Sequence, residues 1–311
     1  MSRLSDLHLK LMRESNYSAY PEAISNNLSR IFLVRTSPVN IYLHVLSELN
    51  IMNLLSSKII FDMRFWFVFA LCITTSLILI GNLINLDTAI IIGNYVSMPL
   101  GLGFVMISIA VLTKFGFGDS IHGLAWIAFV GFSVCWFIGD GMWTLEELFF
   151  EEEPYPSIAD LFYLIGYPFL LMFLIQYLVP MRTRITKNMI LASGIFSVMV
   201  LGLILFILWN FDNLNVAFDD IFSVAYPIAD IFVLFPSVIG VILFFKGKIN
   251  FMWSAILFGI ILNILGDIGF MYLQLSPNES YHTGHPIDVL FLSAYVFMIF
   301  GLYHHIKLFA K

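Results

Sequence analysis

The sequence predicts an all-α fold: a polytopic transmembrane helical bundle of about eight spans, built from two tandem four-helix repeats. Hydrophobic residues make up 60% of the 311 residues and charged residues only 12%. The hydrophobic residues form runs of about twenty or more, which is the length that a helix needs to cross about 30 Å of hydrocarbon. Segments of about ten residues with alternating hydrophobicity, typical of a transmembrane β-barrel, do not occur. These observations predict a protein whose first partner is the lipid bilayer.

Residues 1–62 differ in composition from the rest of the chain and are predicted to form a cytoplasmic N-terminal tail. No positively charged stretch leads directly into an apolar core, so this segment is not a secretory signal. Apolar residues at near-helical spacing between 39 and 60 predict a helix that lies on the membrane surface. A weakly ordered tail, or a natural start at Met63, is the alternative.

Residues 63–311 are predicted to form the membrane domain. Short polar breaks divide it into apolar segments, each long enough for the hydrocarbon layer at about 1.5 Å per residue. Both cysteines, Cys72 and Cys135, lie inside such segments, so they provide neither a disulfide framework nor a metal-binding pattern. The predicted spans are 64–85, 88–113, 119–142, 158–180, 187–209, 217–245, 250–274 and 286–307.

The basic residues predict the orientation of these spans. All 15 Lys and Arg residues lie in the tail or on the side of the membrane that the tail occupies. By the positive-inside rule, both termini are therefore cytoplasmic. Most of the 21 Asp and Glu residues lie at or near the opposite, outer face, where cations would be enriched and anions repelled. Because Lys and Arg are sparse and dispersed, the sequence excludes nucleic acid as a partner.

Similar residues recur at a nearly constant distance along the chain. Asp267 follows Asp140 by 127 residues, and a second Asp pair and a Pro pair keep this spacing within one residue. The spacing predicts a duplication, with repeat one at 64–180 and repeat two at 187–307. Because each repeat holds an even number of spans, the two halves share one orientation and are expected to be related by an axis along the membrane normal.

Three predicted spans carry Asp and Tyr residues at helical spacing, hence on one face of each helix. These residues are Asp160, Tyr163 and Tyr167 in the fourth span, Asp219, Tyr226 and Asp230 in the sixth, and Asp288 and Tyr295 in the eighth. A proline follows Tyr167 and Tyr226 directly, and a proline inside a span frees a backbone carbonyl that needs a partner or a lined cavity. We therefore expect these faces to meet in an outer pocket that binds a small molecule, a lipid or a cation.

Four further residues, Asp140, Trp143, Glu147 and Asp267, complete the candidate pocket. Asp140 and Asp267 are predicted at the C-terminal ends of their helices, where the helix dipole disfavours an anion. Asp230 is predicted about three turns inside its span, where an ionisable group costs several kcal/mol unless it is paired or hydrated. Helix capping therefore does not account for these three carboxyl groups.

Helix capping is the alternative interpretation for the other Asp residues of the pocket. Ser157, Asp160, Asp219 and Asp288 all lie where an N-terminal cap or a first-turn carboxylate is favoured by the helix dipole. For each of them, helix capping is thus an interpretation that needs no ligand-binding role.

His282 and His285 raise the hypothesis of a metal site. They lie in the predicted outer loop before the last span, within reach of Asp267 and Asp288. Imidazole and carboxylate groups together could hold a divalent cation such as zinc, with an open position for water. Two solvated loop histidines are the alternative.

The run from Pro156 to Pro168 reads Pro-Ser-Ile-Ala-Asp-Leu-Phe-Tyr-Leu-Ile-Gly-Tyr-Pro, and it is preceded by Gly139-Asp140, Trp143 and Glu147. This pattern resembles the integral-membrane sensor regions that precede GGDEF and EAL domains in bacterial cyclic-di-GMP proteins. It also resembles stand-alone archaeal and bacterial membrane proteins of the same pattern. The resemblance extends over 64–311 and implies a sensory bundle. Since no GGDEF or EAL motif is present, signalling is expected to need a separate cytoplasmic partner.

Three classes of function follow from these observations. The first is an integral membrane ligand-binding or sensory protein with an acidic outer pocket and no output domain of its own. The second is a cation- or proton-coupled transporter, which the prolines and Asp230 favour. The third is an intramembrane metal- or carboxylate-dependent enzyme that modifies lipid, with Asp140 and Asp267 as general acid and base. No specific nucleophile or complete metal-ligand motif supports the third.

Overall fold

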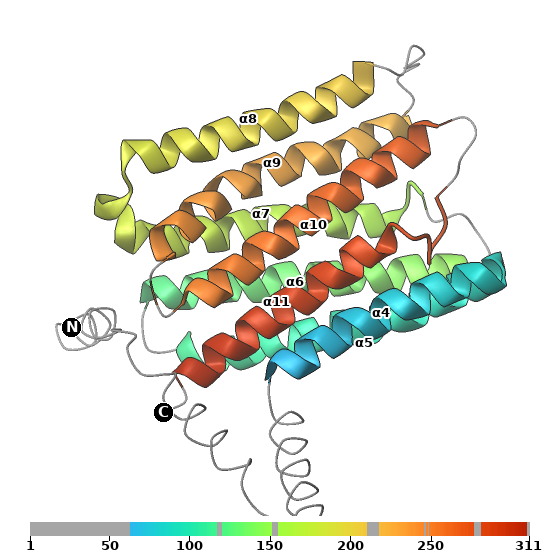
Figure 1. The fold of residues 1–311 in the computed structure, drawn as a ribbon, viewed down its shortest axis with the longest axis horizontal. Helices are drawn as coiled ribbons and strands as arrows, with labels where there is room; N and C mark the ends of the chain where they lie inside the picture. The colour runs from blue at the N-terminus through green and yellow to red at the C-terminus, as the bar shows by residue number, and fades with distance from the viewer. Residues whose placement is uncertain are drawn as a thin grey trace, which may run out of the picture. The chain divides into compact units, whose positions relative to one another are not determined.

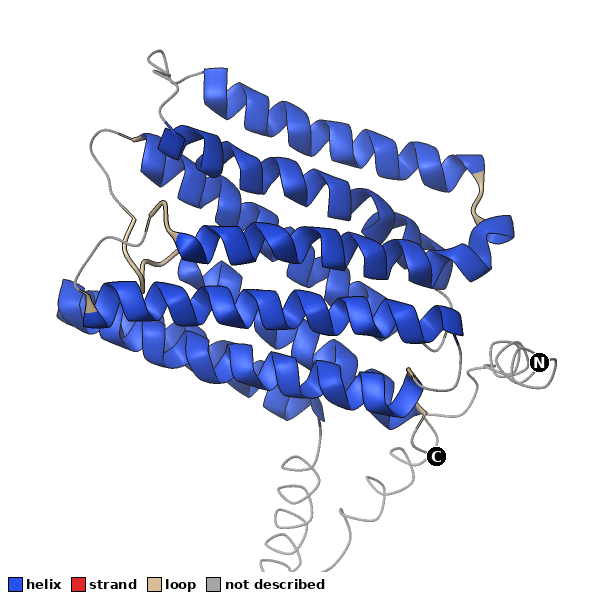
Figure 2. Ribbon diagram, turned by 180° about the vertical axis from the view of Figure 1, so that it is seen from behind, coloured by secondary structure: helices blue, strands red, loops and turns tan. Residues whose placement is uncertain are grey.

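The structure is a computed structural model that describes residues 63–116, 120–150, 155–209, 218–245, 247, 249–276 and 281–309. Eight long α-helices make up this described part of the chain. Within these ranges there is no β-strand (Figures 1 and 2). Each of the eight helices is long and apolar enough to cross a membrane, which confirms the predicted all-α, multi-pass membrane fold. They are α4 Met63–Ile84, α5 Leu86–Phe115, α6 Ser120–Phe149, α7 Ile158–Leu178, α8 Lys187–Trp209, α9 Phe218–Phe244, α10 Asn250–Leu275 and α11 Asp288–Leu308, with a 3-10 helix, η1 Val179–Arg184, after α7.

Two aspartates that were predicted to end their helices lie well inside them. The third span was expected to end at residue 142, but α6 runs to Phe149, and Asp140 lies more than two turns before its end. Asp267 likewise lies about two turns before the end of α10 at Leu275. The prediction that these two Asp residues end their helices is therefore wrong. A helix can continue beyond the hydrocarbon layer when its polar side chains find partners there, as Thr144 and Glu147 do with Asn94.

Contacts divide the chain into two units, Met1–Val68 and Phe69–Lys311. Of the first unit the structure describes only 63–68, the first residues of α4, so the predicted tail and its surface helix lie outside the described residues. The description below concerns the second unit. The predicted tandem repeat and the predicted boundary after residue 62 stay predictions.

Six helices of this unit form a closed ring, called here the helix ring. Along the ring α5 packs against α6, α6 against α7, α7 against α9, α9 against α10, α10 against α11, and α11 back against α5. α8 packs outside the ring on α9 (Figure 1), and Gly81 of α4 lies against Ala89 of α5. The most apolar window of α4 and of α8 is only 17% buried, compared with 61% for α10. The two outer helices therefore expose the largest apolar surface to lipid.

An aromatic core fills the helix ring at the end where α7 finishes and α8 begins. Trp126, Phe129 and Phe173 are at most 1% exposed, and the Phe129 and Phe173 ring centroids lie 4.6 Å apart. Trp253 of α10 lies over Gly240 of α9, where an added Cβ would be 2.5 Å from the indole ring. Large rings can fill this space only because the facing position on α9 is glycine. A cavity inside the ring lies at the other end, where α6 finishes and α7 begins.

Candidate binding site

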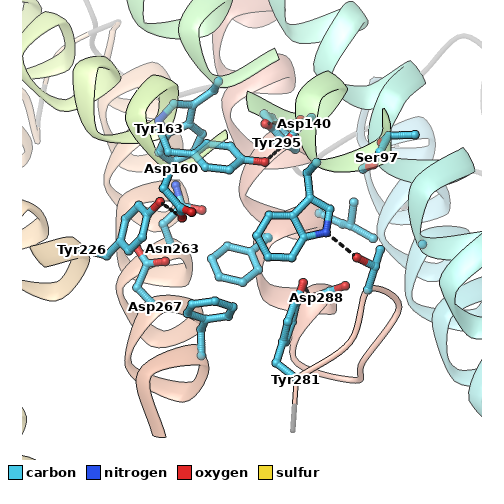
Figure 3. A pocket seen from close by; sticks show the side chains of 18 of the residues that line it. Ser97, Asp140, Asp160, Tyr163, Tyr226, Asn263, Asp267, Tyr281, Asp288 and Tyr295 are labelled. Carbon is cyan, nitrogen blue, oxygen red and sulfur yellow. Dashed lines mark hydrogen bonds between the residues drawn. The ribbon is translucent and has the colours of Figure 1, made fainter. Parts of the chain in front are cut away.

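A cavity of about 140 Å³ lies inside the helix ring at this second end, called here the cavity end (Figure 3). Side chains from all six ring helices and from the α10–α11 loop line it, four of them are aspartates, and none of them is Lys or Arg. The lining consists of Gly93, Asn94 and Ser97 of α5; Trp136, Asp140, Trp143 and Thr144 of α6; Asp160, Tyr163 and Tyr167 of α7; Tyr226 of α9; Asn263, Asp267 and Phe270 of α10; Tyr281 and Thr283 of the loop; and Asp288, Phe291, Leu292 and Tyr295 of α11.

Asp140 is held by hydroxyl groups from two different helices. Tyr163 of α7 donates to its Oδ1 at 2.8 Å, and Tyr295 of α11 donates to its Oδ2 at 2.7 Å. Each carboxylate oxygen thus has a donor of its own, and the three side chains tie α6, α7 and α11 together. Since hydrogen bonds to a charged acceptor are stronger than neutral ones, this cluster fixes the wall of the cavity.

Asp160 both caps its helix and bonds to a neighbouring helix. Its Oδ2 accepts the backbone N–H of Ser157 at 2.7 Å, while the Ser157 hydroxyl oxygen accepts the N–H of Ala159 at 3.1 Å, so the two residues form a capping box at the start of α7. Its Oδ1 accepts the Tyr226 hydroxyl of α9 at 2.5 Å. The capping interpretation of Asp160 is therefore confirmed, and it does not exclude a place in the cavity wall.

The loop between α10 and α11 covers one side of the cavity. Asp288 at the start of α11 accepts the Tyr281 hydroxyl at 2.9 Å and the backbone N–H of Gly284 at 2.7 Å. Burial raises the pKa of the Tyr281 hydroxyl well above its usual value, and the nearby Asp288 carboxylate raises it further. Tyr281 thus stays protonated and remains a donor. The Trp143 indole N–H donates to the Thr283 hydroxyl at 2.7 Å, which holds the loop against α6.

Close packing against α5 fixes the position of this loop. Gly284 has a φ of +82°, in the left-handed region that favours glycine, and an added Cβ there would collide with the backbone carbonyl of Ala89. An added Cβ at Gly93 would lie 2.6 Å from the nitrogen of Gly284. The side-chain amide of Asn82 donates to the Gly284 carbonyl at 2.5 Å. Two glycines and one amide thus allow the loop to lie directly on α5.

Glu147 lies beside the cavity and not in its wall. Its Oε2 accepts the Asn94 amide at 2.6 Å, and its Oε1 lies 3.4 Å from the backbone nitrogen of Thr283. Thr144 donates to the amide oxygen of Asn94 at 2.8 Å. Asn94, which is 2% exposed, therefore links α5 to the last turns of α6 through both ends of its amide.

Asp230 lies behind the cavity wall. It is 1% exposed and does not line the cavity, but its Oδ1 is 3.0 Å from the hydroxyl of Tyr167. The same hydroxyl is 3.0 Å from Oδ2 of Asp267, which does line the cavity. Asp230 was expected to face the pocket; the structure instead connects it to the pocket through Tyr167, because α9 turns Tyr226 and not Asp230 toward the opening.

The remaining predicted residues are Asp219 and two histidines, and the histidines do not line the cavity. The side chain of Asp219, in the first turn of α9, lies outside the described residues. His282 and His285 pack edge to face, with ring centroids 5.4 Å apart, and Nδ1 of His282 is 3.1 Å from the carbonyl oxygen of Thr283. Within the described part of the chain, no group of three or more His, Cys, Asp or Glu residues could hold a metal ion. The predicted divalent-cation site therefore gains no support.

Several cavity residues were missed by the sequence reasoning. Asn94 and Asn263 are each buried inside an apolar helix, and a buried amide in a membrane span is costly unless it is satisfied, so this signal was present in the sequence. Trp136 lies one turn before Asp140 on α6, and its indole N–H has no partner among the described residues. Its place in the cavity follows from the helix phase, once α6 is known to continue past Asp140.

Comparisons of the chain with protein-family models, with curated proteins and with solved structures give no match. The fold and the site by themselves define a class: a multi-pass helical membrane protein with a cavity lined by aspartate and aromatic side chains at one end of its helix ring.

Proposed function

We propose that the protein is an integral membrane ligand-binding protein of the sensory type, whose pocket takes a small molecule that carries a positive charge. The observation that carries this proposal is the cavity lining, which contains Asp140, Asp160, Asp267 and Asp288 and no Lys or Arg. A cleft lined by charges of one sign with low-dielectric walls concentrates ions of the opposite sign. An anionic ligand would find no basic partner among these side chains.

The aromatic lining favours an organic cation over a bare metal ion. The rings of Trp136, Trp143, Phe270, Tyr281 and Phe291 all line the cavity. A cation within about 6 Å of an aromatic ring face is attracted by the ring quadrupole, and quaternary ammonium groups are recognised in this way. The volume of about 140 Å³ corresponds to roughly ten water molecules at about 15 Å³ of comparable space each, which suits a small organic cation.

The distribution of basic residues supports a pocket that faces the outside. Lys114 is in the last turn of α5, Arg182 and Arg184 lie in η1, and Lys307 is in the last turn of α11. All four lie at the end of the bundle opposite the cavity. By the positive-inside rule, that end is cytoplasmic. The resemblance of 156–168 to membrane sensor regions supports signal reception, with a separate protein acting at the cytoplasmic face.

Two reciprocal contacts support the proposed duplication. Tyr167 of α7 contacts Asp267 of α10, and Tyr295 of α11 contacts Asp140 of α6. The two tyrosines are 128 residues apart, and the two aspartates are 127 apart. A two-fold axis between the repeats generates this exchange, because each repeat then supplies a tyrosine to the aspartate of the other.

A matched pair of molecules tests the proposed ligand class. Choline carries a quaternary ammonium group, and 3,3-dimethylbutan-1-ol has the same shape without the charge. A ligand at 100 times its Kd stabilises the folded state by about 2.7 kcal/mol, so thermal unfolding of the purified protein in detergent reports binding. We expect choline to raise the melting temperature and the neutral alcohol to leave it unchanged.

Two variants locate the effect. Asp140→Asn removes a charge from the cavity and should weaken the response to choline, whereas Asp87→Asn, on the exposed first turn of α5 at the same end, should keep it. Equal stabilisation by choline and the alcohol, or an equal choline response in the two variants, would refute the proposal.

A cation-coupled transporter is the second candidate, and the depth of Asp230 favours it. The residue lies twelve positions into α9, about 18 Å along the helix, where ion sites of transporters are typically found. Transport predicts that radiolabelled choline accumulates inside proteoliposomes and that Asp230→Asn abolishes accumulation without abolishing binding. A sensory protein binds choline without accumulation.

A further inference from the structure

The five described aspartates in and around the cavity differ in how many hydrogen-bond donors they receive. Asp140, Asp160 and Asp288 each accept two hydrogen bonds from described residues, one on each carboxylate oxygen. Asp230 and Asp267 share the single hydroxyl of Tyr167, and their two carboxyl groups lie within hydrogen-bonding distance of each other. One hydroxyl carries one hydrogen, so Tyr167 can donate to one of the two carboxylates and not to both. Among the five described aspartates, only this pair receives fewer hydrogen-bond donors than it has carboxyl groups.

Asp140 in the first half of the chain has more hydrogen-bond donors than Asp267, the corresponding residue of the second half. Asp140 is met by Tyr163 from α7 and by Tyr295 from α11. The position 128 residues after Tyr163 is Phe291, which has no hydroxyl to donate to Asp267. The second half of the chain thus lacks one donor where the first half has it, and it places an additional carboxylate, Asp230, in contact with the same tyrosine.

Two oxygen atoms near this pair are buried without a partner. Oδ2 of Asp230 and Oδ1 of Asn263 have no hydrogen-bond partner among the described residues, although the two side chains are only 1% and 3% exposed. Asn263 lies one turn from Asp267 on α10, and both line the cavity. Asp230 and Asn263 lie at the same depth, each twelve residues from the end of its helix at the cavity end, on helices that pack against each other.

Oxygen atoms that lack donors, two carboxylates among them, are ligands for a hard metal cation. We infer that a sodium ion binds where the inner end of the cavity meets Asp230 behind its wall, held by the carboxylates of Asp230 and Asp267, the amide oxygen of Asn263 and the hydroxyl oxygen of Tyr167. The ion supplies the positive charge that two carboxylates in contact with one hydroxyl require in a membrane interior. This site does not depend on the organic ligand proposed above.

A proton and a calcium ion fit this set of oxygens less well. A proton shared by Asp230 and Asp267 joins two oxygens and leaves Oδ1 of Asn263 without a partner, whereas a metal ion coordinates several oxygens at once. Calcium takes six to eight oxygen ligands, usually several of them from carboxylates, and the proposed ligands here are two carboxylates, one amide and one hydroxyl. The chemistry therefore favours a monovalent ion.

Equilibrium binding of ²²Na⁺ to the purified full-length protein tests this inference, with KCl holding the ionic strength constant and no organic cation present. The wild type should bind ²²Na⁺ that unlabelled Na⁺ displaces. Asp230→Asn should weaken binding at least about tenfold, as loss of a metal-site partner does, and Asn263→Leu should weaken it similarly without any change of charge. Asp87→Asn removes a charge from the exposed surface at the cavity end and should bind as the wild type does.

The inference is overturned if the wild type binds no displaceable ²²Na⁺, or if Asp230→Asn and Asn263→Leu bind like the wild type. Displacement by Ca²⁺ far more readily than by Na⁺ would also overturn the assignment to a monovalent ion. Because Asp230→Asn is isosteric and relieves repulsion between carboxylates, it should fold; elution as a single species on size exclusion verifies this before binding is measured. Failure of this test leaves the choline test intact, since that test uses Asp140.

Discussion

Removal of the Tyr226 hydroxyl should destabilise the protein more than removal of an ordinary interhelical hydrogen bond in a membrane. The hydroxyl donates to Oδ1 of Asp160 at 2.5 Å, and both residues are buried, Tyr226 to 6% and Asp160 to 1% exposure. In Tyr226→Phe the Asp160 carboxylate loses this side-chain donor and keeps the backbone N–H of Ser157. The substitution conserves the ring, so it creates no cavity larger than one oxygen atom.

The expected cost follows from the charge on the acceptor. Hydrogen bonds to charged groups contribute about 1.5–3 kcal/mol, whereas double-mutant cycles on interhelical hydrogen bonds in a membrane average about 0.6 kcal/mol. We expect Tyr226→Phe to lower the free energy of unfolding by about 1.5–3 kcal/mol, which is roughly ten- to hundredfold in the unfolding equilibrium. Tyr95→Phe, at a position 71% exposed, should change it by less than about 0.5 kcal/mol.

Reversible unfolding in mixed micelles with increasing SDS measures both values. A double-mutant cycle with Asp160→Asn isolates the interaction between the two side chains. The expected coupling energy is at least about 1 kcal/mol. A cost near 0.6 kcal/mol, or additive effects of the two substitutions, would refute the view that the hydroxyl stabilises a buried charge.

The other predictions concern the loop that covers the cavity. Gly93→Ala should destabilise the protein by about 1–3 kcal/mol, because its Cβ would lie 2.6 Å from the nitrogen of Gly284. Gly202→Ala in α8, with no atom within 4 Å of its added Cβ, is the control and should be neutral or stabilise by up to about 1 kcal/mol. Similar costs for the two substitutions would contradict this account of the loop. Burial raises the pKa of Tyr281, so folding favours its protonated form. This contribution is fully present below about pH 10 and is lost as pH rises toward the higher folded pKa. Melting curves recorded from about pH 8 to pH 11 should therefore fall more steeply for the wild type than for Tyr281→Phe, and parallel curves would contradict the prediction.

The sequence was sufficient to predict the eight spans, because hydrophobic runs bounded by polar residues leave a membrane helix as the only way to satisfy the backbone. The end of α6 was placed too early, and Asp140 and Asp267 were both taken as helix ends, since the prediction took the first polar residues after the apolar run as the boundary. Those residues, Asp140 and Asp267, are polar because a neighbouring helix supplies hydroxyl groups to them. Hydropathy along one helix carries no information about such a neighbour.

The helix phase predicted many members of the cavity wall but not their partners. Spacing placed Asp160, Tyr163 and Tyr167 on one face, and the structure brings all three to the cavity. The spacing in the sequence could not show that Tyr163 bonds to α6 while Tyr167 bonds to α9 and α10, because these pairings depend on the order of the helices around the ring. The contribution of the α10–α11 loop was equally inaccessible, since it depends on the contact between Gly93 and Gly284.

The electrostatic character of the cavity can be measured directly with charged thiol reagents. Ser97 lines the cavity, and a Ser97→Cys variant in a background that lacks Cys72 and Cys135, the chain's two cysteines, offers one thiol there. Membrane-impermeant cationic and anionic methanethiosulfonates are applied from outside the cell. The rate at which each reagent modifies the cysteine is divided by the rate at which the same reagent modifies a free thiol in solution. The proposed acidic, outward-facing pocket predicts that the cationic reagent reacts at least about tenfold faster. Equal rates, faster reaction of the anionic reagent, or reaction only after the cytoplasmic face is opened to the reagents would contradict it.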